Sequence, residues 1–201
     1  MFKIKEREFE IHEARISATI LDPYWYEMYG TEYDHKYFWS INVSANNQVF
    51  GSYSWAPDAS HEDLLLSIRN WHDLENTVYE WKKPEGCFTV FGNENITEAC
   101  IIIGKRKGNK FELSWKGLCD IHWNEEYSEN VPFEIECEAT FCGAGVNASE
   151  KDTDETVLER VSQFFDIHNL KQLPLEQKSY KYQSGVGIAS SVFLPKIENN
   201  A

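Results

Sequence analysis

The sequence predicts an α+β protein: a mostly antiparallel, twisted β-sheet with two amphipathic helices packed on one face. Hydrophobic residues make up 42% of the chain and aromatic residues 14%, which is enough apolar surface for a packed core. Stretches with alternating apolar residues outnumber stretches with helical spacing. Strands and helices do not alternate regularly, which argues against a doubly wound parallel sheet.

Strands are expected where apolar residues recur at every second position. The clearest case is 133–141, in which Phe133, Ile135 and Cys137 alternate with glutamates. Asn46 and Asn47 form a turn that we expect to join two strands into a hairpin, and Gly108 and Asn109 form a second such turn. The expected strands are 9–20, 37–43, 49–55, 88–91, 100–104, 111–123, 133–141 and 180–192.

Two segments carry apolar residues at helical spacing. The first is 60–74, with Ser60 as the expected N-cap. The second begins at Asp152, which forms a plausible capping box with Glu155, and ends near His168. No linker divides the elements, and the stretch Gly143–Ser149 is only a weak candidate for one. We therefore expect a single domain over residues 1–201.

The net charge of −14 and the pI near 4.8 argue against nucleic-acid and anionic-membrane partners. Much of this charge lies between residues 120 and 160. No apolar leader is visible at the N-terminus, which predicts a cytoplasmic protein. The five cysteines include no C-x-x-C pair, so we expect free, mostly buried thiols in a reducing compartment.

A metal site has weak support. Asp120, His122 and Asn124 alternate along a strand-like run, with Glu125 and Glu126 just beyond it. Metal sites usually draw ligands from several elements, so we interpret this run as the polar face of a strand and expect no metal or cofactor. No nucleophile elbow or phosphate loop is present, and no spacing singles out a pair of catalytic carboxylates.

An aromatic cluster between Tyr24 and Trp39 suggests either a lid over the sheet or exposed rings that anchor a partner. The acidic strand 133–141 offers a second surface. Its glutamates repel one another, so a base such as Lys116 on a neighbouring strand would make the row structural. Without such a base, the row is an open face for a cationic partner.

Our leading hypothesis is a non-enzymatic acidic protein that binds a basic protein partner, as an inhibitor or immunity-type protein neutralising a cationic toxin would. One alternative is a hydrolase that uses carboxylates or a metal near Asp120–Glu126. Another is a carbohydrate-binding module built on the Tyr24–Trp39 aromatics. The oligomeric state is not determined by these features. The candidate binding residues are Glu125, Glu126, Glu129, Glu134, Glu136, Glu138, Trp25, Tyr26 and Tyr29.

Overall fold

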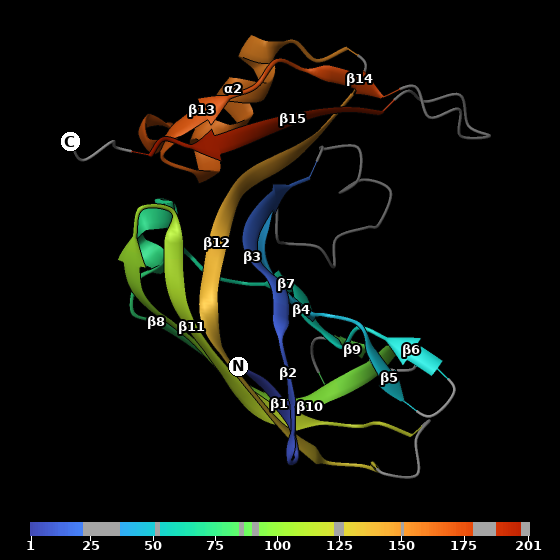
Figure 1. The fold of residues 1–201 in the computed structure, drawn as a ribbon. Coiled ribbons are helices and arrows are strands. Elements are labelled where there is room, and N and C mark those ends of the chain that lie inside the picture. The colour runs from blue at the N-terminus through green and yellow to red at the C-terminus, as the bar shows by residue number, and fades with distance from the viewer. Residues whose placement is uncertain are drawn as a thin grey trace.

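The computed structural model is mostly β, with 62% of residues in strands and 12% helical, and its main sheet is curled and mixed (Figure 1). Within the described part of the chain, this sheet contains 13 strands, and a separate pair of strands forms a second, small sheet. The structure describes residues 1–21, 37–50, 53–84, 87–89, 93–122, 127–149, 151–178 and 188–197.

The main sheet closes on itself through the long strand β12. Residues 131–140 of this strand pair antiparallel with β11, and residues 140–146 pair parallel with β3. The remaining pairings within the sheet are antiparallel. In pairing order, the ring consists of β12 (Val131–Ser149), β11 (Lys110–Cys119), β10 (Asn93–Lys107), β9 (Cys87–Thr89), β7 (Asp58–Leu64), β4 (Tyr37–Ala45) and β3 (Ile11–Ile20).

Shorter elements extend this ring. Strands β1 and β2 continue the sheet from β12, and β8 pairs with β10. The small sheet is β5 with β6. Strands β13, β14 and β15 form an upper layer with the α-helix α2 (Figure 1). The bounds are β1 (Phe2–Ile4), β2 (Arg7–Phe9), β5 (Gln48–Phe50), β6 (Tyr53–Trp55), η1 (Trp71–Leu74), β8 (Thr77–Trp81), α2 (Asp154–Phe164), η2 (Ile167–Asn169), β13 (Leu170–Gln172), β14 (Glu176–Lys178) and β15 (Ile188–Pro195).

Gly143 lies where one edge of β12 exchanges its neighbour β11 for β15 of the upper layer, while the other edge stays paired with β3. Its φ of 111° is unfavourable for residues with a side chain, and an added Cβ would lie 2.2 Å from the carbonyl oxygen of Phe193. The register with β3 shifts between Phe141 and Gly143. Beyond this point β12 pairs with β15. The stretch Gly143–Ser149, a weak candidate for a linker, is therefore strand.

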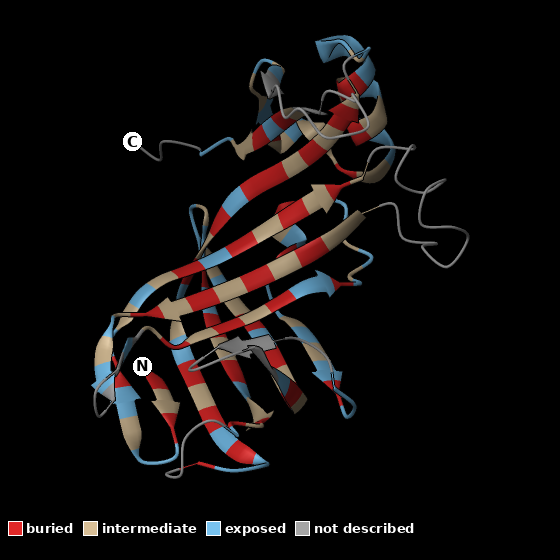
Figure 2. Cartoon of the chain, turned by 90° about the vertical axis from the view of Figure 1, so that its right-hand side faces the viewer, coloured by how far each residue is buried: buried red, intermediate tan, exposed pale blue. Residues whose placement is uncertain are grey.

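Alternation along the strands builds one core, visible as repeating buried bands in Figure 2. The rings of Trp71 and Phe141 stack with centroids 5.1 Å apart. Trp39, which is fully buried, contacts Phe165 edge-on at 5.5 Å. The same hydrophobic cluster therefore joins the ring, the short helix η1 and the segment that follows α2.

The prediction of two helices on a sheet face is wrong, because 60–74 contains no α-helix. Strand β7 begins at Asp58, and Ala59 and His61 face the core at strand spacing. Pairing with β4 and β9 gives these alternate residues their burial. Leu65, part of the supposed apolar stripe, is 47% exposed. Only the four-residue 3₁₀ helix η1 follows, capped by Asn70 rather than Ser60.

The second predicted helix exists as α2, between Asp154 and Phe164. Its N-cap is Thr153, whose side chain forms a capping box with Thr156, rather than the predicted Asp152 and Glu155. Val161 is fully buried, as the apolar stripe requires. None of the helices that the structure describes is long and apolar enough to cross a lipid bilayer.

One predicted hairpin is confirmed and one is wrong. Strands β10 and β11 meet at a turn in which Gly108 has a φ of 64°. The strand β4, however, pairs with β3 and β7, whereas residues 48–50 pair with 53–55. The strand predicted over 180–192 is β15 from Ile188 onward, and residues 180–187 lie outside the described part of the chain.

Candidate functional site

The acidic row of β12 faces a base on the neighbouring strand. Lys116 of β11 forms ion pairs with Glu134 and Glu136, and its Nζ lies 3.3 Å from Oε1 of the latter. Ser114 Oγ donates a hydrogen bond of 2.8 Å to Glu136. Glu138 forms an ion pair with Lys110. The row is therefore part of a cross-strand charge ladder, the structural alternative that the sequence left open.

The other predicted binding residues do not extend the row within the described structure. Glu129 is exposed in the turn before β12. Glu125 and Glu126 lie outside the described residues, as do Trp25, Tyr26 and Tyr29. The described aromatics of that cluster serve the core. Trp39 is buried, and the ring of Tyr37 packs 5.2 Å from that of Phe165.

Asp120 has a structural role. Its Oδ1 accepts a 2.9 Å hydrogen bond from the backbone N–H of Asn130, which stabilises the turn leading into β12. His122 is exposed. Across the described ranges, no group of three or more His, Cys, Asp or Glu side chains is placed to hold a metal ion. Asn124, the third member of the alternating run, lies outside these ranges.

The outward side of the strands β8, β10, β11 and β12 carries a feature that sequence reasoning missed. We call it the outer face. Val78 of β8 lies opposite Ile102 of β10, and these side chains are 56% and 43% exposed. Ser114 is the next residue across the sheet, followed by Glu136. An exposed apolar pair thus lies beside the charge ladder.

Acidic side chains lie on the two strands that carry this apolar pair and on the strand beside them. Glu80 follows Val78 on β8, while Glu98 and Glu112 lie on β10 and β11. All three are exposed. Glu112 lies directly opposite Glu138 in the β11–β12 register, and the ion pair with Lys110 already offsets the charge of Glu138. The residues of the outer face are Val78, Glu80, Glu98, Cys100, Ile102, Gly104, Lys110, Glu112, Ser114, Lys116, Glu134, Glu136 and Glu138.

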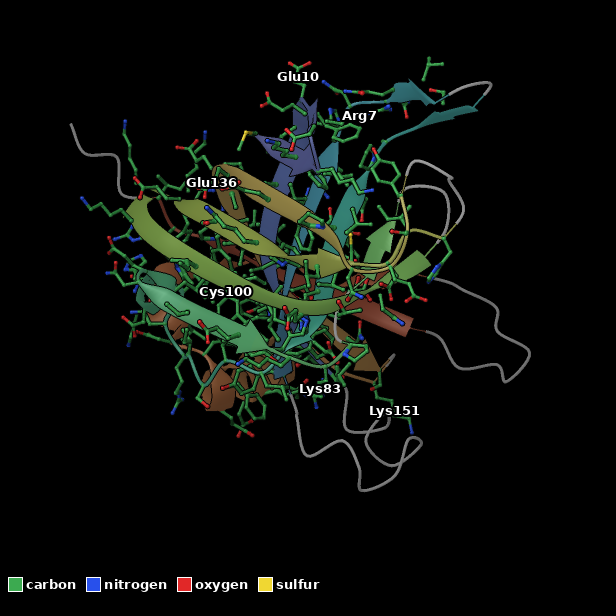
Figure 3. All side chains as sticks on the ribbon, turned by 90° about the horizontal axis from the view of Figure 1, so that it is seen from below. Arg7, Glu10, Lys83, Cys100, Glu136 and Lys151 are labelled. Atoms are coloured by element: carbon green, nitrogen blue, oxygen red, sulfur yellow. The ribbon has the colours of Figure 1, made fainter. Side chains whose placement is uncertain are left out.

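Small residues hollow out the centre of the outer face. Gly104 and Ser114 lie in a depression with a volume of about 260 Å³. Ile102 forms one wall, and Glu112 and Glu136 line the depression as well. Figure 3 labels Glu136 and Cys100, which mark β12 and β10 in the view from below. The depression is large enough for one long side chain or several waters.

The charges of the outer face affect its titrating groups. Burial raises the pKa of the Cys100 thiol, and its hydrogen bond to Glu80 raises the pKa further. Hydrogen bonds to Glu134 and Glu136 raise the pKa of Lys116 above its ordinary value. Glutamates still outnumber lysines here, so the field near the depression is negative at neutral pH.

The alternation of Glu98, Cys100 and Ile102 could have identified this outer face from sequence. The run Ile101-Ile102-Ile103 hid that signal, because three adjacent isoleucines suggest burial on both sides. In the structure Ile101 and Ile103 are 1% exposed, whereas Ile102 points outward. The outward row of β10 is therefore acidic at one end and apolar at the other.

The cysteines match their predicted state only in part. Cys100, Cys137 and Cys142 are free thiols. Cys119 is buried, and burial raises the pKa of Cys137 to about 11. Cys142, however, is exposed, which contradicts the expectation of mostly buried thiols for this residue. The side chain of Cys87 is outside the described part of the chain.

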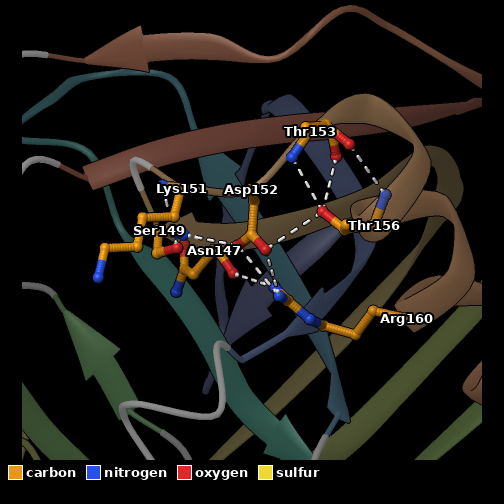
Figure 4. A network of polar contacts seen from close by, with 7 residues as sticks. All are labelled: Asn147, Ser149, Lys151, Asp152, Thr153, Thr156 and Arg160. Carbon is orange, nitrogen blue, oxygen red and sulfur yellow. Dashed lines mark hydrogen bonds and ion pairs between the residues drawn. The ribbon is translucent and has the colours of Figure 1, made fainter.

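A second polar cluster joins β12 to α2 (Figure 4). Arg160 donates hydrogen bonds of 2.9 and 3.0 Å to the two carboxylate oxygens of Asp152. The backbone N–H of Ser149 donates to the same carboxylate at 2.8 Å. Burial alone would raise the pKa of Asp152, but these hydrogen bonds outweigh it and hold the pKa below its ordinary value. This cluster is a structural anchor for the helix.

No family model matches the sequence, and no curated protein or solved structure matches the chain.

Proposed function

We propose that this chain is a cytoplasmic, non-enzymatic binding protein that docks a basic protein partner on its outer face. An inhibitor or immunity-type protein that neutralises a cationic toxin would act in this way. The observation that carries the proposal is the exposed apolar pair Val78 and Ile102 with glutamates on the strands around it. Interfaces commonly combine an apolar centre with a charged, solvated rim.

Net charge supports the same choice of partner. At −14, the chain attracts cationic proteins over several ångströms and repels anionic ones. The ladder on β12 changes the surface that was expected from sequence. Because Lys116 already neutralises part of Glu134 and Glu136, the partner's charges are expected to favour the carboxylates nearer β10, namely Glu80, Glu98 and Glu112.

Comparative capture from the source cells tests this proposal. The baits are the wild-type chain, an outer-face variant with Glu80, Glu98 and Glu112 changed to Lys, and a control variant. In the control, Glu62, Glu159 and Glu176 are changed to Lys. All six positions are exposed, and each triple reversal changes the net charge equally.

The proposal predicts a basic protein that the wild-type and control baits retain and the outer-face variant loses. Its association rate with the wild-type chain should fall steeply with added salt, as for electrostatically steered pairs. Equal retention on all three well-folded baits would contradict the proposal. So would the absence of any partner whose retention depends on the outer face.

A further inference from the structure

We infer that the outer face recognises an extended segment of the basic partner through one apolar side chain and one long cationic side chain two residues further along. This inference rests on the proposed function, and it adds the chemistry of the segment that makes contact. Three features of the described residues support it: the exposed apolar pair, the depression beside it, and the spacing between the two.

The apolar pair forms one half of the proposed binding site. Val78 and Ile102 are cross-strand neighbours on β8 and β10, so their side chains form a continuous patch rather than two isolated ones. Isolated apolar residues on a surface are ordinary, but adjacent ones beside a hollow offer area for a partner side chain. A leucine or valine laid on this patch would remove all three apolar side chains from water.

The depression forms the other half. Its Ile102 wall is apolar and suits the methylene stem of a lysine or arginine, and Glu112 offers its carboxylate to the cationic head. Glu136 lines the depression as well, but its carboxylate already accepts a hydrogen bond from Ser114 and pairs with Lys116. Charge complementarity selects a basic occupant. A second copy of this chain would instead place acidic surface against acidic surface.

The spacing of the two halves sets the pattern of the partner. Neighbouring strands are about 4.8 Å apart, so the midpoint of Val78 and Ile102 lies about 7 Å from Ser114 along the row. In an extended segment, residues i and i+2 point to the same side and are also about 7 Å apart. A segment that crosses the strands with the pattern apolar-x-cation therefore fills both halves at once.

Titration with short synthetic peptides tests this pattern. The first peptide carries Leu and Arg at positions i and i+2 in a Gly/Ser background. The second carries Arg at i+1, which points it away from the sheet, and the third carries Glu at i+2. Backbone amide shifts in ¹⁵N NMR spectra give both the affinity and the location of binding.

The first peptide is expected to bind at millimolar concentration and to shift the amides of Val78, Ile102 and Ser114. The second should bind several-fold more weakly, and the third should not bind measurably. Equal affinity of the first two peptides, or shifts elsewhere only, would overturn the inference. Absence of binding by the first peptide would overturn it as well.

Two variants test whether the cationic side chain of the peptide binds in the depression. S114L fills the depression and should lower the affinity for the first peptide at least tenfold. E112Q keeps the shape of the depression and removes one charge. It should lower the affinity for the first peptide about two- to fivefold, as expected for an exposed ion pair. E159Q on α2 is the matched control and should leave the affinity unchanged. Unchanged affinity in both well-folded outer-face variants would contradict binding of the cationic side chain in the depression.

The captured partner separates this inference from the proposed function. If the partner binds wild-type and S114L chains equally but loses affinity for the triple Lys variant, the apolar-x-cation pattern is wrong and the docking function stands. If the partner is indifferent to both variants, the docking function fails as well.

Discussion

Two polar clusters of this protein use their carboxylates in opposite ways. Asp152, at the junction of β12 and α2, has 12% of its side chain exposed and is held by Arg160 and a backbone N–H. Glu112, at the centre of the outer face, is exposed and lies opposite another glutamate. A carboxylate with fixed donors stabilises the fold, whereas an exposed carboxylate is open to a partner's cation.

The charge ladder lies between these extremes. Lys116 links Glu134 and Glu136, but its side chain is 57% exposed, so its ion pairs are open to solvent. Ion pairs at such positions contribute little to stability because water competes for both charges. The comparison therefore predicts that changes to the outer face affect binding, and that changes to the α2 cluster or to the core affect folding.

The largest expected effect is a difference in the free energy of unfolding between variants on the two sides of β10. Ile101 faces the core at 1% exposure, and Ile102 on the outer face is 43% exposed. I101A should lower the free energy of unfolding by about 3 kcal/mol, because it leaves a cavity among packed side chains. I102A should lower it by less than about 1 kcal/mol. Urea unfolding measures both, and similar losses would show that Ile102 belongs to the core.

A smaller loss is expected when the α2 cluster is broken. R160A leaves the Asp152 carboxylate largely buried without its bidentate partner, so unfolding should become easier by about 2 kcal/mol. K116A is the matched change on the outer face and should leave the urea midpoint within experimental error. If the two variants unfold alike, the distinction between structural and available charges would be lost.

The smallest expected effect is the pH dependence of the stability that Asp152 contributes. The folded pKa of Asp152 lies below its ordinary value, so the carboxylate stabilises the fold above its unfolded pKa of about 3.9. This stabilisation is lost as the pH falls through the folded pKa. The stability difference between wild type and D152N should therefore be full near pH 6 and shrink below pH 4. A pH-independent difference in urea melts would contradict this role.

Sequence periodicity located most of the strands, because burial on one side of a sheet imposes a period of two on residues such as Phe133 and Ile135. It failed where two periods overlap. Residues 60–74 satisfy a helical spacing through Leu64, Ile68 and Trp71, and only pairing with β4 and β9 favours a strand up to Leu64. That pairing depends on residues distant in sequence, so no local pattern reveals it.

The site was predictable in its charge and in one compensating base. The acidic character of residues 120–160 is plain in the sequence, and Lys116 was a candidate partner of the β12 row, but which glutamates it contacts depends on the β11–β12 register. The apolar pair of the outer face depends on the β8–β10 pairing, which brings Val78 against Ile102. Neither arrangement follows from spacing within one segment.

Alkylation of the thiols in the complex tests the docking claim most directly. Cys100 lies on the outer face between Glu80 and Lys116, and Cys142 is an exposed thiol near Arg15. Mass spectrometry follows the modification of both in the free chain and with the captured basic partner. The outer-face account predicts that the partner slows alkylation of Cys100 several-fold and leaves Cys142 unchanged. Unchanged alkylation of Cys100 in the saturated complex would contradict it.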